Sequence, residues 1–149
     1  ENLVYEIVGE GPEEATLRQM VSELGLENHV VFHGRVDDVQ KGQFYARADL
    51  FVMPVANDPV DKEGFGLVFL EAAQYAVSSV TTNVTGVTEA VVDGETGIVL
   101  PDQDDERLAK TILELSRNTN LRIRLGLEAY DRTAKFTCEE QFGKLKPYL

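Results

Sequence analysis

Two glutamates, Glu63 and Glu71, stand eight residues apart around a short turn in the stretch EGFGLVFLE. Gly64 and Gly66 bracket Phe65, and glycines at such positions let the backbone turn sharply and approach a ligand closely. A polar loop precedes the turn, and good helix formers follow it. The stretch therefore predicts a loop that closes on a ligand between two carboxylates.

A helix is expected to begin at Leu67. The first backbone N–H groups of a helix have no intrahelical acceptor, so those of Gly66, Leu67 and Val68 would point toward the loop. Such a helix end favours anions and above all phosphate. The carboxylates would repel that phosphate, but a charged acceptor binds sugar hydroxyls about twice as strongly as a neutral one.

A phosphate flanked by two polyols satisfies both requirements, and a nucleotide sugar is such a ligand. The alternative is that Glu63 only stabilises the helix electrostatically and Glu71 lies on a solvated face.

Strand and helix patterns alternate along the chain and position this turn. Strands are expected at residues 3–8, 30–33, 50–53, 79–82 and 97–100, and helices at 13–24, 39–48, 67–75, 104–116, 120–135 and 139–145, with a short segment at 89–92 after a turn at Gly86. This order predicts an α/β, Rossmann-like three-layer sandwich, with a parallel sheet of about five strands covered on both faces. We expect one domain over residues 1–149.

Ligands of open parallel sheets bind at the carboxyl ends of the strands. That rule selects the loops at residues 9–12, 34–37, 55–66, 83–86 and 101–102, with the glutamate motif in the middle.

The composition narrows the possible partners. A net charge of -12 argues against a nucleic-acid polymer, which would need clustered Lys and Arg, although backbone donors can still hold a small anion. No stretch is apolar enough for a membrane span, and no leader is recognised. The single cysteine, Cys138, is interpreted as a packing residue in a reducing, cytoplasmic protein. No cluster has metal-ligand spacing, and the lone His33 is expected to be structural.

Six motifs occur in a fixed order along nearly the whole chain. They are IVGEGP at residues 7–12, VVFHGRV at 30–36, ADLFVMP at 48–54, EGFGLVFLEA at 63–72, DGETGIVLP at 93–101 and LRIRLGLEAYDR at 121–132. In this order and spacing the chain resembles the C-terminal, donor-binding half of a GT-B glycosyltransferase of the retaining family four.

The resemblance implies a site for a nucleoside-diphosphate sugar around the motif. Glu71 would accept hydrogen bonds from the ribose hydroxyls, and Glu63, the expected catalytic residue, would contact hydroxyls of the donor sugar. The backbone at Phe65, Gly66 and Leu67, together with Gly64, would hold the diphosphate and the sugar.

The resemblance adds a second set of residues to this site. The turn at Gly34, Arg35 and Val36 matches the position that lies along the nucleobase, and Gly9 and Gly11 would line the same cleft. A solvated surface arginine is an equal alternative for Arg35.

The chain departs from the family pattern at three positions. Ala76 and Ser78 stand where members usually have a glycine and a proline, and Thr85 replaces a glycine. The substitution at Thr85 removes backbone freedom near the expected phosphate site.

A further strand and helix open this half in the family, and their loop brings an arginine and a lysine to the diphosphate. The sequence begins after them, so the first central strand of the order 3-2-1-4-5-6 is expected to be missing between the strands at 3–8 and 50–53. The unpaired edges suggest that a longer protein or a partner chain supplies that strand.

The implied function is transfer of a sugar, with retention at the anomeric carbon, to a glycan, lipid or small-molecule acceptor, as in polysaccharide biosynthesis. No cofactor is expected beyond the donor substrate, whose base (UDP, GDP or ADP) is not distinguished. The acceptor would bind an N-terminal domain or partner chain, so the isolated chain should be inactive, and that domain could attach the protein peripherally to a membrane. The alternatives are a non-catalytic nucleotide- or sugar-binding module, a subunit of a split transferase and, less favoured, a GT-B-like sugar-nucleotide epimerase.

Overall fold

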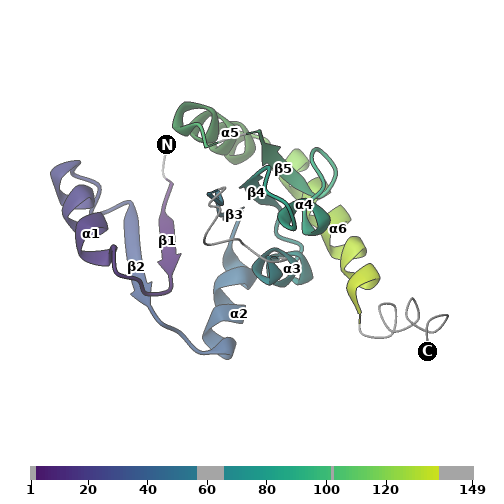
Figure 1. The fold of residues 1–149 in the computed structure, drawn as a ribbon, viewed down its shortest axis with the longest axis horizontal. Coiled ribbons are helices and arrows are strands. Elements are labelled where there is room, and N and C mark those ends of the chain that lie inside the picture. Colours follow the sequence, from purple (N-terminus) through teal and green to yellow (C-terminus); the bar gives the residue numbers. More distant parts are fainter. Residues whose placement is uncertain (1–2, 57–65, 102, 138–149) are drawn as a thin grey trace. The chain divides into compact units, whose positions relative to one another are not determined.

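The computed structural model describes residues 3–56, 66–101 and 103–137 (Figure 1). The chain divides into two compact units, Glu1–Phe44 and Tyr45–Leu149. The helix expected at residues 139–145 and the residue Cys138 lie outside the described residues.

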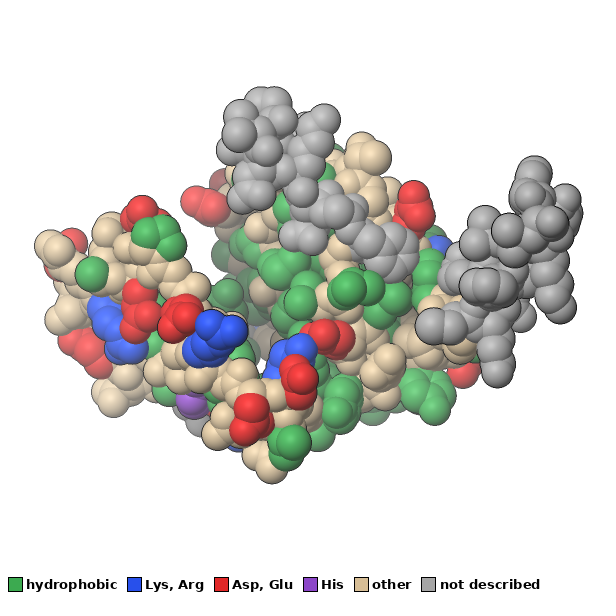
Figure 2. Space-filling view, turned by 60° about the horizontal axis from the view of Figure 1, so that its bottom comes forward, with side chains coloured by type: hydrophobic (Ala, Val, Ile, Leu, Met, Phe, Trp, Pro, Cys, Tyr) green, Lys and Arg blue, Asp and Glu red, His purple; other side chains and the backbone are tan. Residues whose placement is uncertain are grey.

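The first unit is built from two parallel strands and a helix between them. Strand β1 (Tyr5–Val8) pairs with β2 (Val30–Gly34), helix α1 (Glu14–Glu23) connects them, and α2 (Asp38–Arg47) begins in this unit. Helix α1 ends at Glu23, one residue before the expected limit of 24, and Gly25 follows with a φ of 66°. Among the described residues, every fully buried hydrophobic side chain lies in the second unit. Hydrophobic side chains accordingly reach the surface between acidic and basic ones (Figure 2).

The second unit is a three-stranded parallel sheet with helices on both faces (Figure 1). The strands are β3 (Phe51–Val52), β4 (Ser79–Thr82) and β5 (Gly97–Leu100), in the order β3-β4-β5. The helices are α3 (Leu67–Gln74), α4 (Val87–Ala90), α5 (Asp105–Arg117) and α6 (Thr119–Thr133), followed by the 3-10 turn η1 (Ala134–Phe136).

The core of this unit lies on both faces of the sheet, because successive strand residues point to opposite sides. On one face, Val80 and Leu100 of the strands pack with Leu115 of α5 and Leu125 of α6. The other face is covered by α3 and α4, whose buried cluster consists of Phe69, Val84, Val87, Ala90 and Val91. The expected layered α/β architecture is confirmed.

The element boundaries follow the sequence closely, with small shifts. The strands expected at 79–82 and 97–100 are found with those limits, whereas the strand expected at 3–8 begins at Tyr5 and the one expected at 50–53 is only Phe51–Val52. The short segment after Gly86 is helix α4, two residues earlier than expected.

The expected sheet of five strands is present as two sheets, β1-β2 and β3-β4-β5. Within the described residues, no pairing joins β1 to β3. The missing first strand of the expected order, and its source, remain predictions.

The end of α3 is closed by a Schellman motif with an unusual residue. The N–H of Val77 donates to the carbonyl of Ala72 (3.1 Å), and the N–H of Ala76 donates to that of Ala73 (2.9 Å). Ala76 has a φ of 55°, and it is the only residue other than glycine with a positive φ among the described residues. Ala76 therefore occupies the left-handed position that this motif normally gives to glycine.

Candidate functional site

The start of α3 is set by Gly66. This residue is left-handed (φ 69°, ψ 54°), and a Cβ atom there would lie 2.7 Å from the ring of Phe69. The N–H of Phe69 donates to the carbonyl of Gly66 at 2.9 Å and closes the first turn. The prediction that Gly66 turns the chain into a helix beginning at Leu67 is confirmed. In this geometry the first amides of the helix, including that of Val68, have no intrahelical acceptor.

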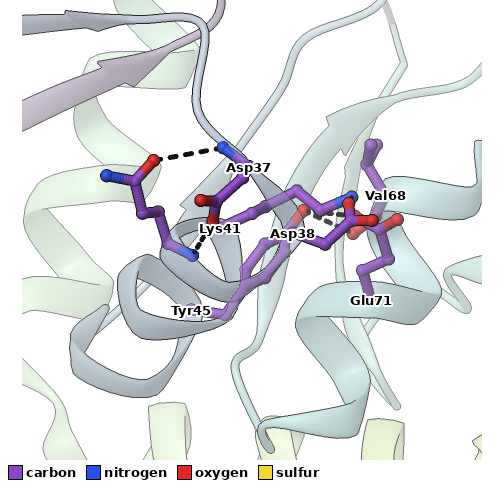
Figure 3. A network of polar contacts seen from close by, with 7 residues as sticks. Asp37, Asp38, Lys41, Tyr45, Val68 and Glu71 are labelled. Carbon is purple, nitrogen blue, oxygen red and sulfur yellow. Dashed lines mark hydrogen bonds and ion pairs between the residues drawn. The ribbon is translucent and has the colours of Figure 1, made fainter.

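Glu71 lies about one turn into α3 and makes a side-chain contact with Tyr45, a residue of α2 (Figure 3). The phenol Oη of Tyr45 donates to Oε2 of Glu71 at 3.1 Å and lies 3.4 Å from the carbonyl oxygen of Val68. Glu71 is partly exposed, whereas Tyr45 is only 9% exposed. Glu71 therefore does not lie on a freely solvated face, which was the alternative expected from the sequence.

Burial raises the pKa of Tyr45 well above its usual value of 10.0, and the charge and hydrogen bond of Glu71 raise this pKa further. The phenol consequently remains a protonated donor throughout the physiological range. It can therefore donate its hydrogen bond to Glu71 throughout that range.

The ring of Tyr45 is held by aromatic packing. It stacks on Tyr75 with centroids 5.8 Å apart and meets Phe51 edge-on, also at 5.8 Å. Sequence reasoning did not single out Tyr45. The sequence offers one signal, because Tyr45 lies on the helix predicted at residues 39–48. A tyrosine that is buried there usually needs a hydrogen-bond partner for its hydroxyl group.

In the first unit, two of the predicted site segments meet. The N–H of Gly9 donates to the carbonyl of Gly34 at 2.8 Å, and both glycines have a positive φ, 140° and 64°. This contact brings the segment with Gly9 and Gly11 beside the turn that continues into Val36. Their expected role along a nucleobase remains a prediction.

Two side chains near this turn have partners within the first unit. Arg35 forms an ion pair with Glu10 at 3.6 Å, and its side chain is 83% exposed. His33 bonds through Nε2 to Oε1 of Glu6 at 3.0 Å, and its ring lies 4.5 Å from that of Phe44. The contacts of His33 agree with the structural role expected for it.

The remaining motif residues, Glu63, Gly64 and Phe65, lie outside the described residues. Their expected contacts with the donor sugar and diphosphate, including the catalytic role of Glu63, stay predictions.

A pocket of about 350 Å³ lies at the carboxyl ends of β3, β4 and β5, which is the sheet edge selected from the sequence. One of its lining residues, Thr82, is joined to Val55 by two hydrogen bonds: its hydroxyl donates to the carbonyl of Val55 at 2.5 Å and accepts from the N–H of Val55 at 2.9 Å. The pocket lining includes none of the predicted site residues that the structure describes. The lining residues are Pro54, Thr82, Leu100, Gln103, Asp104, Asp105 and Leu108.

Parallel strands joined by helices, with a glycine turn that opens the helix after β3, define a Rossmann-like α/β protein. The family model described as glycosyl transferases group 1 matches residues 1–132, and the chain belongs to this family. The expected family and its GT-B fold are thereby confirmed.

Three related proteins illustrate this assignment. The chain is 32% identical over 146 residues to a GDP-mannose-dependent alpha-(1-6)-phosphatidylinositol monomannoside mannosyltransferase of Mycobacterium tuberculosis, covering 96% of the chain and 38% of the relative. It is 33% identical over 123 residues to the N-acetyl-alpha-D-glucosaminyl L-malate synthase of Bacillus anthracis, covering 83% of the chain and 30% of the relative. The solved C-terminal domain of a glycosyl transferase group 1 family protein (LpcC) from Francisella tularensis superposes with a TM-score of 0.78 at 26% identity, covering 91% of this chain and 70% of that one.

The chain thus spans only about a third of the length of these two curated relatives. In the part of the chain that the structure describes, no helix combines the length and the apolar character needed to cross a lipid bilayer.

Proposed function

We propose that the chain is the donor-binding half of a retaining glycosyltransferase, which passes a sugar from a nucleoside-diphosphate sugar to a glycan, lipid or small-molecule acceptor. The observation that carries this proposal is the geometry of α3. Gly66 turns the chain so that the helix begins at Leu67, and about one turn later Glu71 presents a carboxylate hydrogen-bonded to Tyr45. Amides that can donate to a phosphate and a carboxylate that can accept from hydroxyl groups thus stand about 6 Å apart along one helix, at 1.5 Å per residue.

Each group has a defined task in this proposal. The amides of the first turn of α3 stabilise the charge that grows on the leaving diphosphate, by about 3 kcal/mol for each well-placed donor. Glu71 accepts hydrogen bonds from the ribose hydroxyls and so fixes the nucleotide. Glu63 is assigned to the donor sugar from the family resemblance. The acceptor and any general base belong to an N-terminal domain or a partner chain.

The identity of the donor is open to direct measurement. The mycobacterial relative is described as GDP-mannose-dependent, so GDP and GDP-mannose are the first ligands to test, followed by the UDP and ADP compounds. The single cysteine, Cys138, agrees with a reducing cytoplasmic location, which the proposal includes.

Calorimetric titration of these nucleotides into the full-length protein, with the variant Glu71→Ala, tests the site. Removing hydrogen bonds to a charged acceptor costs about 1.5–3 kcal/mol, which is a loss of affinity of about tenfold or more. The matched control is Glu114→Ala, an exposed glutamate on α5, which should leave affinity unchanged. Equal affinities for wild type and Glu71→Ala would remove Glu71 from the site.

Turnover separates a transferase from a binding module. Release of the nucleoside diphosphate from the donor by the full-length protein, lost in Glu63→Ala, is the result expected for a transferase. Nucleotide binding without any turnover by the full-length protein would instead identify a non-catalytic module.

A further inference from the structure

We propose that Tyr45 is a positioning residue for the donor site, which holds the Glu71 carboxylate in the orientation that accepts the vicinal hydroxyls of the donor ribose. This inference rests on the proposed function of Glu71. It adds a residue from another helix, 26 positions away in the sequence, to a site so far defined only by the motif and the glycine turns.

The side chains of Tyr45 and Glu71 differ in how firmly they are held. A glutamate has three side-chain torsions, and a partly exposed one exchanges between rotamers unless something holds it. Tyr45 is 9% exposed and its ring lies between Phe51 and Tyr75. The packed core therefore fixes the position of the hydroxyl oxygen, and the 3.1 Å bond to Oε2 transmits that position to Glu71.

The bond from Tyr45 takes up only part of the hydrogen-bond capacity of the Glu71 carboxylate. An ionised carboxylate offers about four lone-pair sites, and the Tyr45 hydroxyl occupies one of them on Oε2. Because the hydroxyl group is uncharged, this bond leaves the charge of the carboxylate in place. The arrangement suits a carboxylate whose task is to accept bonds from other hydroxyl groups.

The test measures ribose preference. For the full-length protein, we take whichever of GDP, UDP and ADP binds best and compare its affinity with that of its 2′,3′-dideoxy form. Tyr45→Phe should lower the ribo-to-dideoxy affinity ratio about three- to tenfold, with little change in affinity for the dideoxy form. The matched control is Tyr75→Phe, which removes a hydroxyl from the ring stacked on Tyr45 and should leave the ratio unchanged.

Coupling to Glu71 provides a second readout. In the Glu71→Ala background, Tyr45→Phe should have no further effect on the ratio, because the two residues then act as one unit. A purely structural role would weaken binding of both nucleotide forms equally, and that result, or an unchanged ratio in Tyr45→Phe, would overturn the proposal.

The same measurements separate the two proposals. If Glu71→Ala abolishes the ribose preference and Tyr45→Phe preserves it, only the positioning role is wrong. If Glu71→Ala itself leaves the ratio unchanged, or if no nucleotide binds, the proposed function fails and the role of Tyr45 fails with it.

Discussion

Replacing Ala76 by glycine should stabilise this protein, although most alanine-to-glycine changes destabilise. Ala76 closes α3 with a φ of 55°, and its N–H and that of Val77 complete the Schellman bonds to Ala73 and Ala72. Ala76 also occupies a position where the family usually has glycine. Ala76 therefore carries a side chain that its own left-handed backbone conformation disfavours.

The size of the effect follows from two opposing terms. Left-handed backbone costs a residue with a Cβ atom about 1–2 kcal/mol, and glycine removes that cost. Glycine also increases the conformational entropy of the unfolded chain, which lowers the free energy of unfolding by about 0.4–1 kcal/mol. The net gain for Ala76→Gly is about 0.5–1 kcal/mol, or roughly 1–4 °C in Tm for a chain of this length.

Urea and thermal unfolding of the wild type and two variants measure this. The matched control is Ala109→Gly, the same chemical change at an exposed position within α5, which should destabilise by about 1 kcal/mol. The reasoning requires opposite signs for the two variants. If Ala76→Gly destabilises as much as Ala109→Gly, the left-handed strain assigned to Ala76 is wrong.

Two further predictions concern the same region. A Cβ atom on Gly126 of α6 would overlap the carbonyl oxygen of Ala76 and lie 2.8 Å from its carbonyl carbon, so Gly126→Ala should cost about 3 kcal/mol in urea unfolding. A cost below about 1 kcal/mol would contradict this backbone contact. The pKa of Tyr45 is raised in the folded protein above its value of 10.0 in the unfolded chain. The neutral phenol therefore contributes its full stabilisation below about pH 10, and this contribution is lost as the pH rises further. Tyr45→Phe should therefore reduce the fall in Tm above about pH 10. A dependence of Tm on pH identical to that of the wild type would contradict this prediction.

The sequence was a good guide wherever a local rule decides the structure. The limits of β4 and β5 were predicted because short runs of strand formers end at turn residues such as Pro101. The turn at Gly66 was predicted because glycine alone adopts its conformation easily, and the measured φ of 69° agrees. The pairing of the first two strands likewise follows from their helical crossover.

Contacts between segments that lie far apart in the sequence could not be predicted from local rules. The bond between Tyr45 and Glu71 joins two helices, and their spacing in the sequence does not encode it. The substitution at Ala76 was noticed, but nothing local shows that an alanine would keep a left-handed conformation. The pocket edge was located by the strand-end rule, whereas the contribution of Asp104 and Asp105 depends on how α5 packs beside β5.

The position of Glu71 follows from how α3 is held at both ends. Gly66 fixes its start through a turn that admits no side chain, and the close contact of Gly126 with the Ala76 turn fixes its end. Between them, Tyr45 ties the Glu71 carboxylate to the aromatic core. Because these constraints exist without a ligand, binding need not pay for ordering the carboxylate, which favours affinity. A change at Ala76 or Gly126 should therefore reach the nucleotide through Glu71, although neither residue is proposed to contact it.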